Sequence, residues 1–299
     1  MTWLSAFGVV RPTGGVGMVG ATVHAIESHE VSVEGQRLHY LEAGEGPPVL
    51  FLHGWPTSAQ LWRHVLPRVA RTHRAIALDL PGFGRSDKPL NQRYSFGYFE
   101  RTIDGFLQQL ELERVGLVVH DLGGPAGLYW AIKHVEKVRE VAILNTLCFP
   151  EISWAVKAFV LATFTPGLRR YLSSPAGVAQ AIRFGVANKD RITPDVARIY
   201  SAPFEDRDAR KALLKAGQGL SPRRFRELGQ GLSKLEGVPV RLLYGERDRI
   251  LPDVAETMAR IKRILPHAEL SSIPNCGHFL QEDRPDEVAD ILADFFAGK

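Results

Sequence analysis

The chain has 299 residues, 45% of them hydrophobic and 23% charged, with a formal net charge of +4 and a pI of 9.1. This composition excludes a disordered chain and suits one large α/β domain with a smaller insertion. The basic residues are scattered, so no nucleic-acid partner is expected, and two cysteines, Cys148 and Cys276, indicate neither a disulfide framework nor a metal site.

Residues 1–28 are expected to form a loose N-terminal extension. The stretch from Met1 to Gly20 is mildly apolar and rich in glycine, but it lacks the basic start and the cleavage site of a secretory signal. No apolar run of about 18 residues occurs anywhere, so no membrane partner is expected and a reducing cytoplasm is the expected location. The glycines have no strand before them, which argues against a dinucleotide-binding loop.

From residue 29 onward, strands and helices are predicted to alternate. Two alternating stretches around Glu34-Gly35 predict a β-hairpin over residues 29–33 and 37–42. Short apolar runs predict buried strands at residues 48–52, 73–80, 115–120, 138–144, 238–244 and 268–273. Helical spacing predicts helices at 58–70, 96–112, about 123–134, 254–264 and 285–296. The alternation predicts an α/β fold with a mostly parallel eight-stranded sheet flanked by helices.

The alternation stops at residue 147 and resumes near residue 236. The stretch between them contains helical pieces broken by prolines, and no strand-like run. We therefore predict a helical cap over residues 147–235, inserted into a core made of residues 29–146 and 236–299. Trp154 and residues 159–164 are candidates for an apolar pocket wall, although ordinary packing within the cap explains them equally well.

Asp121 is the candidate nucleophile. It lies at a strand-to-helix junction and is followed by Gly123 and Gly124, which allow the sharp turn on which hydrolases of this fold class hold their nucleophile. The usual serine is absent, and no G-x-S-x-G motif occurs elsewhere in the chain. The alternative is that Asp121 only caps the following helix.

Three further segments supply partners for this aspartate. His53-Gly54-Trp55-Pro56 follows the third strand, Asp248 follows the seventh and His278 follows the eighth. All lie at carboxyl ends of strands, where α/β sheets bind ligands, and they follow the order nucleophile, acid, histidine. Glu246 is a rival for the acid, and Asn145, after the sixth strand, is an amide and cannot be the acid.

From about residue 29, the chain resembles the α/β-hydrolases of the branch that contains epoxide hydrolases and haloalkane dehalogenases. The resemblance rests on the motifs HGWP at 53–56, PGFGRSDKP at 81–89, HDLGG at 120–124 and NCGH at 275–278. It implies that the aspartate attacks carbon to form an ester, which water then hydrolyses with the help of the histidine. It also favours Asp248 over Glu246, because Asp248 matches the family's G-x-x-D pattern.

This chemistry assigns a role to each residue. Asp121 is the nucleophile, His278 is the general base, and Asp248 orients His278. Backbone N–H groups of Trp55 and Leu122 are expected to form the oxyanion hole. The surrounding pocket is expected to include His53, Gly54, Pro56 and His120.

The leaving group is the open question. Dehalogenases usually carry a tryptophan after the nucleophile, whereas this chain has Leu122, which has no side-chain donor. We therefore expect an epoxide hydrolase that acts on a small apolar epoxide and water, with no cofactor or metal, as a monomer or homodimer. Haloalkane dehalogenation is the alternative, and a non-catalytic ligand sensor is a remoter one. Tyr171 and Tyr200, the only tyrosines of the predicted cap, are the candidate proton donors, although each is equally well explained by packing.

Overall fold

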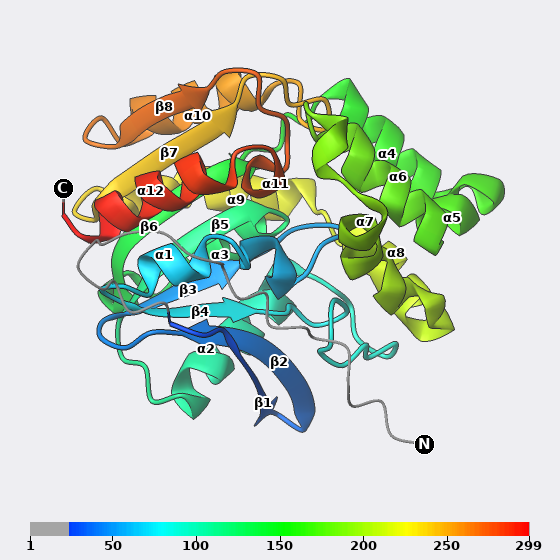
Figure 1. The fold of residues 1–299 in the computed structure, drawn as a ribbon. Helices are drawn as coiled ribbons and strands as arrows, with labels where there is room; N and C mark the ends of the chain where they lie inside the picture. The colour runs from blue at the N-terminus through cyan, green and yellow to red at the C-terminus, as the bar shows by residue number, and fades with distance from the viewer. Residues whose placement is uncertain (1–23, 299) are drawn as a thin grey trace, which may run out of the picture.

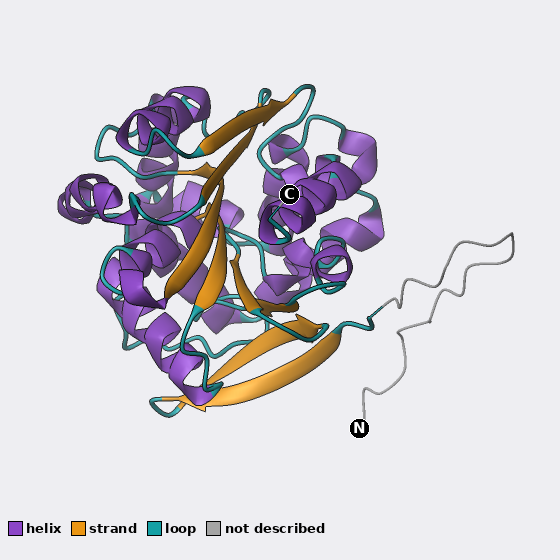
Figure 2. Ribbon diagram, turned by 90° about the vertical axis from the view of Figure 1, so that its left-hand side faces the viewer, coloured by secondary structure: helices purple, strands orange, loops and turns teal. Residues whose placement is uncertain are grey.

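The structure is a computed structural model that describes residues 24–298. Eight strands form one sheet in the order β1-β2-β4-β3-β5-β6-β7-β8, and helices cover both of its faces (Figure 2). Only β2 runs against the others, because both β1 and β4 pair with it in antiparallel register. The mostly parallel eight-stranded sheet that the sequence predicts is confirmed. The predicted N-terminal extension lies outside the described residues up to residue 23.

The strands agree closely with the apolar runs of the sequence, since strands buried on both faces contain few polar residues. Their bounds are β1 Glu27–Val33, β2 Gln36–Ala43, β3 Pro48–Leu52, β4 Arg74–Leu78, β5 Val115–Asp121, β6 Val138–Thr146, β7 Val240–Gly245 and β8 Glu269–Ile273. The helices of the core are α1 Leu66–Val69, α2 Phe96–Gln109, α3 Gly123–Ala131, α10 Val254–Ile264, α11 Leu280–Asp283 and α12 Pro285–Phe296.

Between β6 and β7 the chain forms helices that we call the cap, α4–α9; α4–α8 gather on the right in Figure 1, and α9 lies nearer the middle, in contact with α3. The sequence analysis predicts that this insertion spans residues 147–235. The cap helices are α4 Trp154–Phe164, α5 Pro166–Leu172, α6 Pro175–Gly185, α7 Pro194–Ser201, α8 Arg207–Gln218 and α9 Pro222–Gly231.

Three helix predictions differ from the structure, one of them because α3 ends at Ala131 rather than near residue 134. The helix predicted over 58–70 is instead a 3₁₀ turn, Ala59–Trp62, followed by the short α1. Pro67 lies in the first turn of α1, and a helix cannot run through a proline because its ring clashes with a preceding carbonyl. Helix α2 ends at Gln109 rather than 112, and Glu111 then takes a left-handed backbone with φ of 56°.

The cap is joined to the core beside the loop that follows β8. The buried carboxylate of Asp283 accepts hydrogen bonds from the backbone N–H groups of Ala187 and Asn188, at 2.8 and 2.9 Å, and from that of Gly277 at 2.7 Å. The backbone N–H of His278 donates to the carbonyl of Gly185 at 2.7 Å. The C-terminal end of α6 is therefore held directly against the loop that carries the predicted base.

Candidate active site

Asp121 sits at the tip of β5 in a strained turn. It is not a glycine, yet its φ is 50°, in the left-handed region that non-glycine residues rarely adopt. Two positions beside this turn have no space for a side chain. A Cβ on Gly123 would lie 2.4 Å from the carbonyl oxygen of Leu52, and one on Gly54 would lie 2.2 Å from the Cβ of Asp121. This geometry explains why glycine occupies both positions.

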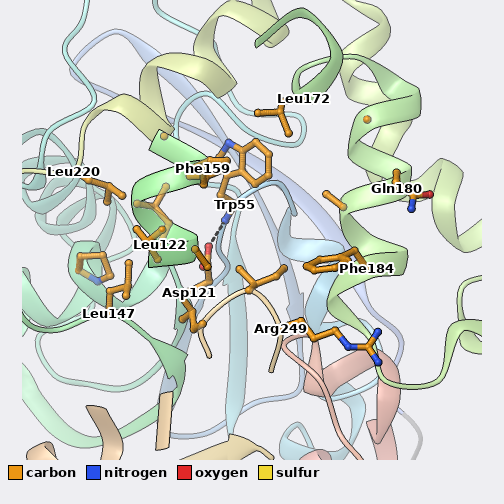
Figure 3. Close-up of a pocket in the computed structure, with 18 of the residues that line it drawn as sticks. Trp55, Asp121, Leu122, Leu147, Phe159, Leu172, Gln180, Phe184, Leu220 and Arg249 are labelled. Carbon is orange, nitrogen blue, oxygen red and sulfur yellow. Dashed lines mark hydrogen bonds between the residues drawn. The ribbon is translucent and has the colours of Figure 1, made fainter. Parts of the chain in front are cut away.

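The Asp121 carboxylate has two differently placed oxygens. Oδ1 accepts a hydrogen bond from the backbone N–H of Trp55 at 2.6 Å, drawn as the dashed line in Figure 3, and the backbone N–H of Leu122 also bonds the carboxylate. Oδ2 lies 3.4 Å from Nε2 of His278. One oxygen is thus bound by the predicted oxyanion donors, and the other is left to react.

His278 is connected to Asp248 and Asn145 by a buried chain of hydrogen bonds. Its Nδ1 donates to Oδ2 of Asp248 at 2.8 Å. The other oxygen of Asp248 accepts from the backbone N–H groups of Ile250 and Leu251, at 2.8 and 2.7 Å. Nδ2 of Asn145 donates to Asp248 at 2.7 Å, and its Oδ1 accepts from the N–H of Gly245 at 3.1 Å. Asp248 is therefore fixed on all sides and fixes the imidazole in turn.

A cavity of about 330 Å³ opens over Asp121 and is lined mainly by apolar side chains (Figure 3). Core and cap both contribute to it. Its polar members other than Asp121 are Tyr171, Gln180 and Arg249. The apolar part includes Trp55, Leu122, Leu147, Val156, Phe159, Phe184 and Leu220.

Known proteins resemble this chain in sequence and in fold. Residues 47–285 match the family described as alpha/beta hydrolase fold. A cis-3-alkyl-4-alkyloxetan-2-one decarboxylase of Shewanella oneidensis is 27% identical, with 92% of this chain and 89% of the relative covered. Haloalkane dehalogenase 2 of Mycobacterium bovis is 30% identical, with 87% and 91% covered. The epoxide hydrolase CorEH superposes with a TM-score of 0.80 at 23% identity, over 92% of this chain and 99% of that one.

The chain belongs to the α/β-hydrolase family. Its relatives include haloalkane dehalogenases, in the branch that the sequence motifs indicate, and it shares its fold with an epoxide hydrolase. Their names differ in substrate, so the family fixes the fold and the hydrolase class but not the bond that is cleaved.

The charges at the site of this α/β-hydrolase favour an ion pair in the resting state. Burial opposes ionisation of Asp121, but the neighbouring His278 outweighs it and holds the pKa of the carboxyl below its ordinary value. Burial likewise opposes charge on His278, but the carboxylates of Asp248 and Asp121 outweigh it and raise its pKa to about 10. The imidazole is therefore protonated at neutral pH while Asp121 keeps its charge.

Four residues that the sequence assigns to the pocket lie outside its lining. His53 and His120 are fully buried, and Gly54 and Pro56 also lie behind the cavity surface. Nε2 of His53 accepts from the N–H of Leu80 at 3.1 Å, so its Nδ1–H donates to the carbonyl of Gly54 at 2.9 Å. These four residues support the loops of the site and do not contact substrate space, so that prediction is wrong.

His120 has a supporting role of its own. Its Nε2 donates to the carbonyl of His278 at 2.9 Å. Burial, followed by repulsion from His278, lowers the pKa of His120 to about 4, so its ring is neutral. A neutral donor at this position holds the His278 loop without adding positive charge beside the imidazolium.

The two candidate tyrosines lie in different surroundings. Tyr171 lines the cavity and is half exposed. Tyr200 is fully buried; its hydroxyl donates to Glu282 and accepts from Arg63 at 3.0 Å, and it does not reach the cavity. The prediction of Tyr200 as a proton donor is wrong, because this ion pair already holds its hydroxyl. Of the predicted pocket wall, Phe159 lines the cavity, whereas Trp154 faces outward.

Proposed function

We propose that the protein is an epoxide hydrolase that forms an ester on Asp121. Oδ2 of Asp121 attacks a ring carbon, the ring C–O bond breaks, and the ring oxygen takes a proton from Tyr171. The ester is neutral, so the pKa of His278 falls and its proton passes through solvent to the Tyr171 phenolate. His278 is then free to act as the base of the second step.

In the second step, His278 takes a proton from water as the hydroxide attacks Cγ of Asp121. The charge that develops on Oδ1 is stabilised by the N–H groups of Trp55 and Leu122, each contributing roughly 3 kcal/mol. Collapse expels the product alkoxide, which takes the proton from His278. The Asp121 carboxylic acid then returns a proton to the imidazole and restores the resting ion pair.

One observation favours an epoxide over a halide. Trp55 and Leu122, whose backbone N–H groups bond the Asp121 carboxylate, offer no free side-chain N–H to a departing halide. Leu122 has no donor, and the indole Nε1 of Trp55 donates to the cap carbonyl of Leu213 at 3.2 Å. A departing halide would lose this stabilisation. An epoxide instead needs an acid, and the Tyr171 hydroxyl is the phenol among the cavity residues.

A second candidate is the opening of a four-membered cyclic ester, the substrate type in the name of the Shewanella oneidensis relative. Attack of Asp121 on the sp³ ring carbon would break the C–O bond and release a carboxylate, which needs no proton. Arg249 lines the cavity and has no ion pair among residues 24–298. Its guanidinium, which points away from Asp121 in Figure 3, offers a cation for such a group.

The substrate class is tested with three compounds and three products. The purified enzyme is incubated with styrene oxide, with 1-bromobutane and with a cis-3,4-dialkyloxetan-2-one, and diol, bromide and alkene are measured. The proposal expects diol as the fastest product. Faster bromide release would establish dehalogenation, the activity in the name of the Mycobacterium bovis relative, and faster alkene formation would favour the cyclic ester.

The proton donor is tested with a matched pair of variants. Tyr171→Phe is expected to slow ester formation from an epoxide by about a hundredfold, the usual contribution of a general acid. Tyr200→Phe, a control outside the cavity, should leave that rate unchanged. Equal rates for wild type and Tyr171→Phe in a stopped-flow single turnover would remove Tyr171 from this role.

A further inference from the structure

The exposed large apolar residues of the described chain are concentrated in the cap. Eight such side chains occur, and six of them lie on α4, α5 and α6. We call these six the cap face: Trp154, Leu161, Phe164, Leu168, Tyr171 and Phe184. Trp154 is 76% exposed and Leu161 is 69% exposed. Single exposed apolar residues are ordinary, but a concentration of this size marks an interaction surface.

Helix α4 supplies the core of the cap face. Trp154, Leu161 and Phe164 are spaced by seven and three residues, so they share one side of the helix. The opposite side carries Val156 and Phe159, which line the cavity. A helix that is apolar all round is normally buried. Half of α4 covers the pocket, and its outer half has no cover in the described chain.

The charged residues of α4, α5 and α6 are all basic. Residues 152–189 contain no aspartate or glutamate. The same stretch carries Lys157, Arg169 and Arg170, all exposed and none in an ion pair within the described part of the chain. Apolar side chains with basic residues beside them are the pattern of a helix that lies in the interface of an anionic membrane.

We propose that the cap face docks on the surface of an anionic lipid bilayer. A second copy of the chain fits less well, since a twofold contact would bring Arg169 and Arg170 close to the same arginines of the other copy. Tyr171 and Phe184 belong both to the cap face and to the cavity lining, so the cavity opens at the docked surface. Apolar substrates dissolved in the bilayer would reach Asp121 without crossing water.

This proposal revises the expectation from the sequence that the chain has no membrane partner. That expectation rested on the lack of a spanning run, and no helix among the described residues is long and apolar enough to cross a bilayer. Docking at the interface needs only one apolar face and nearby positive charge.

Binding is measured with phosphatidylcholine vesicles, with and without phosphatidylglycerol. We expect the full-length protein to cosediment with the anionic vesicles and to be released by high salt. Trp154 supplies a second signal, because it is the most exposed of the four tryptophans in residues 24–298. Its fluorescence should shift to the blue on binding and be quenched by brominated lipid. Trp154→Phe should still bind but lose that signal.

Two sets of variants separate the apolar and the charged contributions. Arg169→Glu/Arg170→Glu should weaken binding to anionic vesicles at least thirtyfold, since each basic residue near such a surface contributes about fivefold. Leu161→Gln/Phe164→Gln should abolish binding. The controls are Arg263→Glu and Leu270→Gln, exposed residues outside the cap, which should bind as the wild type does.

Two results would overturn the proposal. One is equal sedimentation of the wild type and both cap variants with anionic vesicles. The other is a concentration-dependent dimer, detected by analytical ultracentrifugation without lipid, that Leu161→Gln/Phe164→Gln dissociates, because the cap face would then join two copies. Vesicle binding needs no substrate, so either outcome is independent of whether the enzyme opens epoxides.

Discussion

The Asp121 carboxylate illustrates how its surroundings assign different tasks to two chemically identical oxygens. Oδ1 is held by backbone N–H groups, and Oδ2 faces His278. That Asp121, Asp248 and His278 lie together could be predicted from sequence because each follows a strand of the sheet, in an order that few folds share. The role of Tyr200 could not, since its partners Arg63 and Glu282 are 137 and 82 positions away.

The charge on His278 gives a prediction at the same scale. Asp121→Asn removes one of the two carboxylates that raise the pKa of His278 to about 10, so the imidazole should titrate at lower pH in the variant. The nitrogen chemical shifts of the ring, followed by NMR, measure this directly. Identical titration in both proteins would contradict the proposed switch from imidazolium to base.

The same shift affects stability. The folded pKa of His278 lies above its ordinary value of 6.5, so the folded state binds more protons between these values. Its stabilising contribution is complete below pH 6.5 and is lost as the pH rises towards about 10. In Asp121→Asn, the stabilising contribution of His278 should be lost at a lower pH than in the wild type. Free energies of unfolding, measured by chemical denaturation across this pH range, test this.

At the scale of elements, turns and irregular segments were harder to predict than strands. Strand β3 was predicted to the residue, because five apolar residues bounded by a proline and His53-Gly54 fit little else. The segment 58–70 has helical spacing but splits at Pro67, where backbone geometry overrides the apolar pattern. Packing of the cap helices depends on distant contacts that periodicity does not encode.

Helix α7 provides the prediction at this scale. Tyr200 joins α7 to Arg63 and to Glu282 of α11. Tyr200→Phe should lower the free energy of unfolding by about 2 kcal/mol, since it removes a buried hydrogen bond to a charged group. Ester formation should be unchanged. Unchanged stability with slower ester formation would return Tyr200 to the role of proton donor.

The whole molecule is a sheet and a cap that meet around the reacting groups. The sheet could be predicted from the sequence, but not the hydrogen bonds that tie it to the helices between β6 and β7. Several of these bonds lie beside the His278 loop: Asp283 accepts from the N–H groups of Ala187 and Asn188, and the N–H of His278 donates to the carbonyl of Gly185. The position of His278, the proposed base, therefore depends on the cap, and opening the cap would disturb it.

Cap and core should consequently unfold together. We expect one transition in urea, with coincident changes in tryptophan fluorescence and far-UV circular dichroism. Asp283→Ala should lower the free energy of unfolding by about 3 kcal/mol, because it leaves buried N–H groups without an acceptor. Two separate transitions in the wild type would show that the cap folds independently.

The central claim is that a carboxylate oxygen of Asp121 bonds to substrate carbon. Many turnovers in water enriched in ¹⁸O, followed by proteolysis and mass spectrometry, test it most directly, because hydrolysis of the ester places a water oxygen on Cγ of Asp121. The account predicts ¹⁸O in the peptide that contains Asp121 and, in a single turnover, product oxygen that comes from the protein. A peptide without label, with all labelled oxygen in the product from the first turnover, would contradict it.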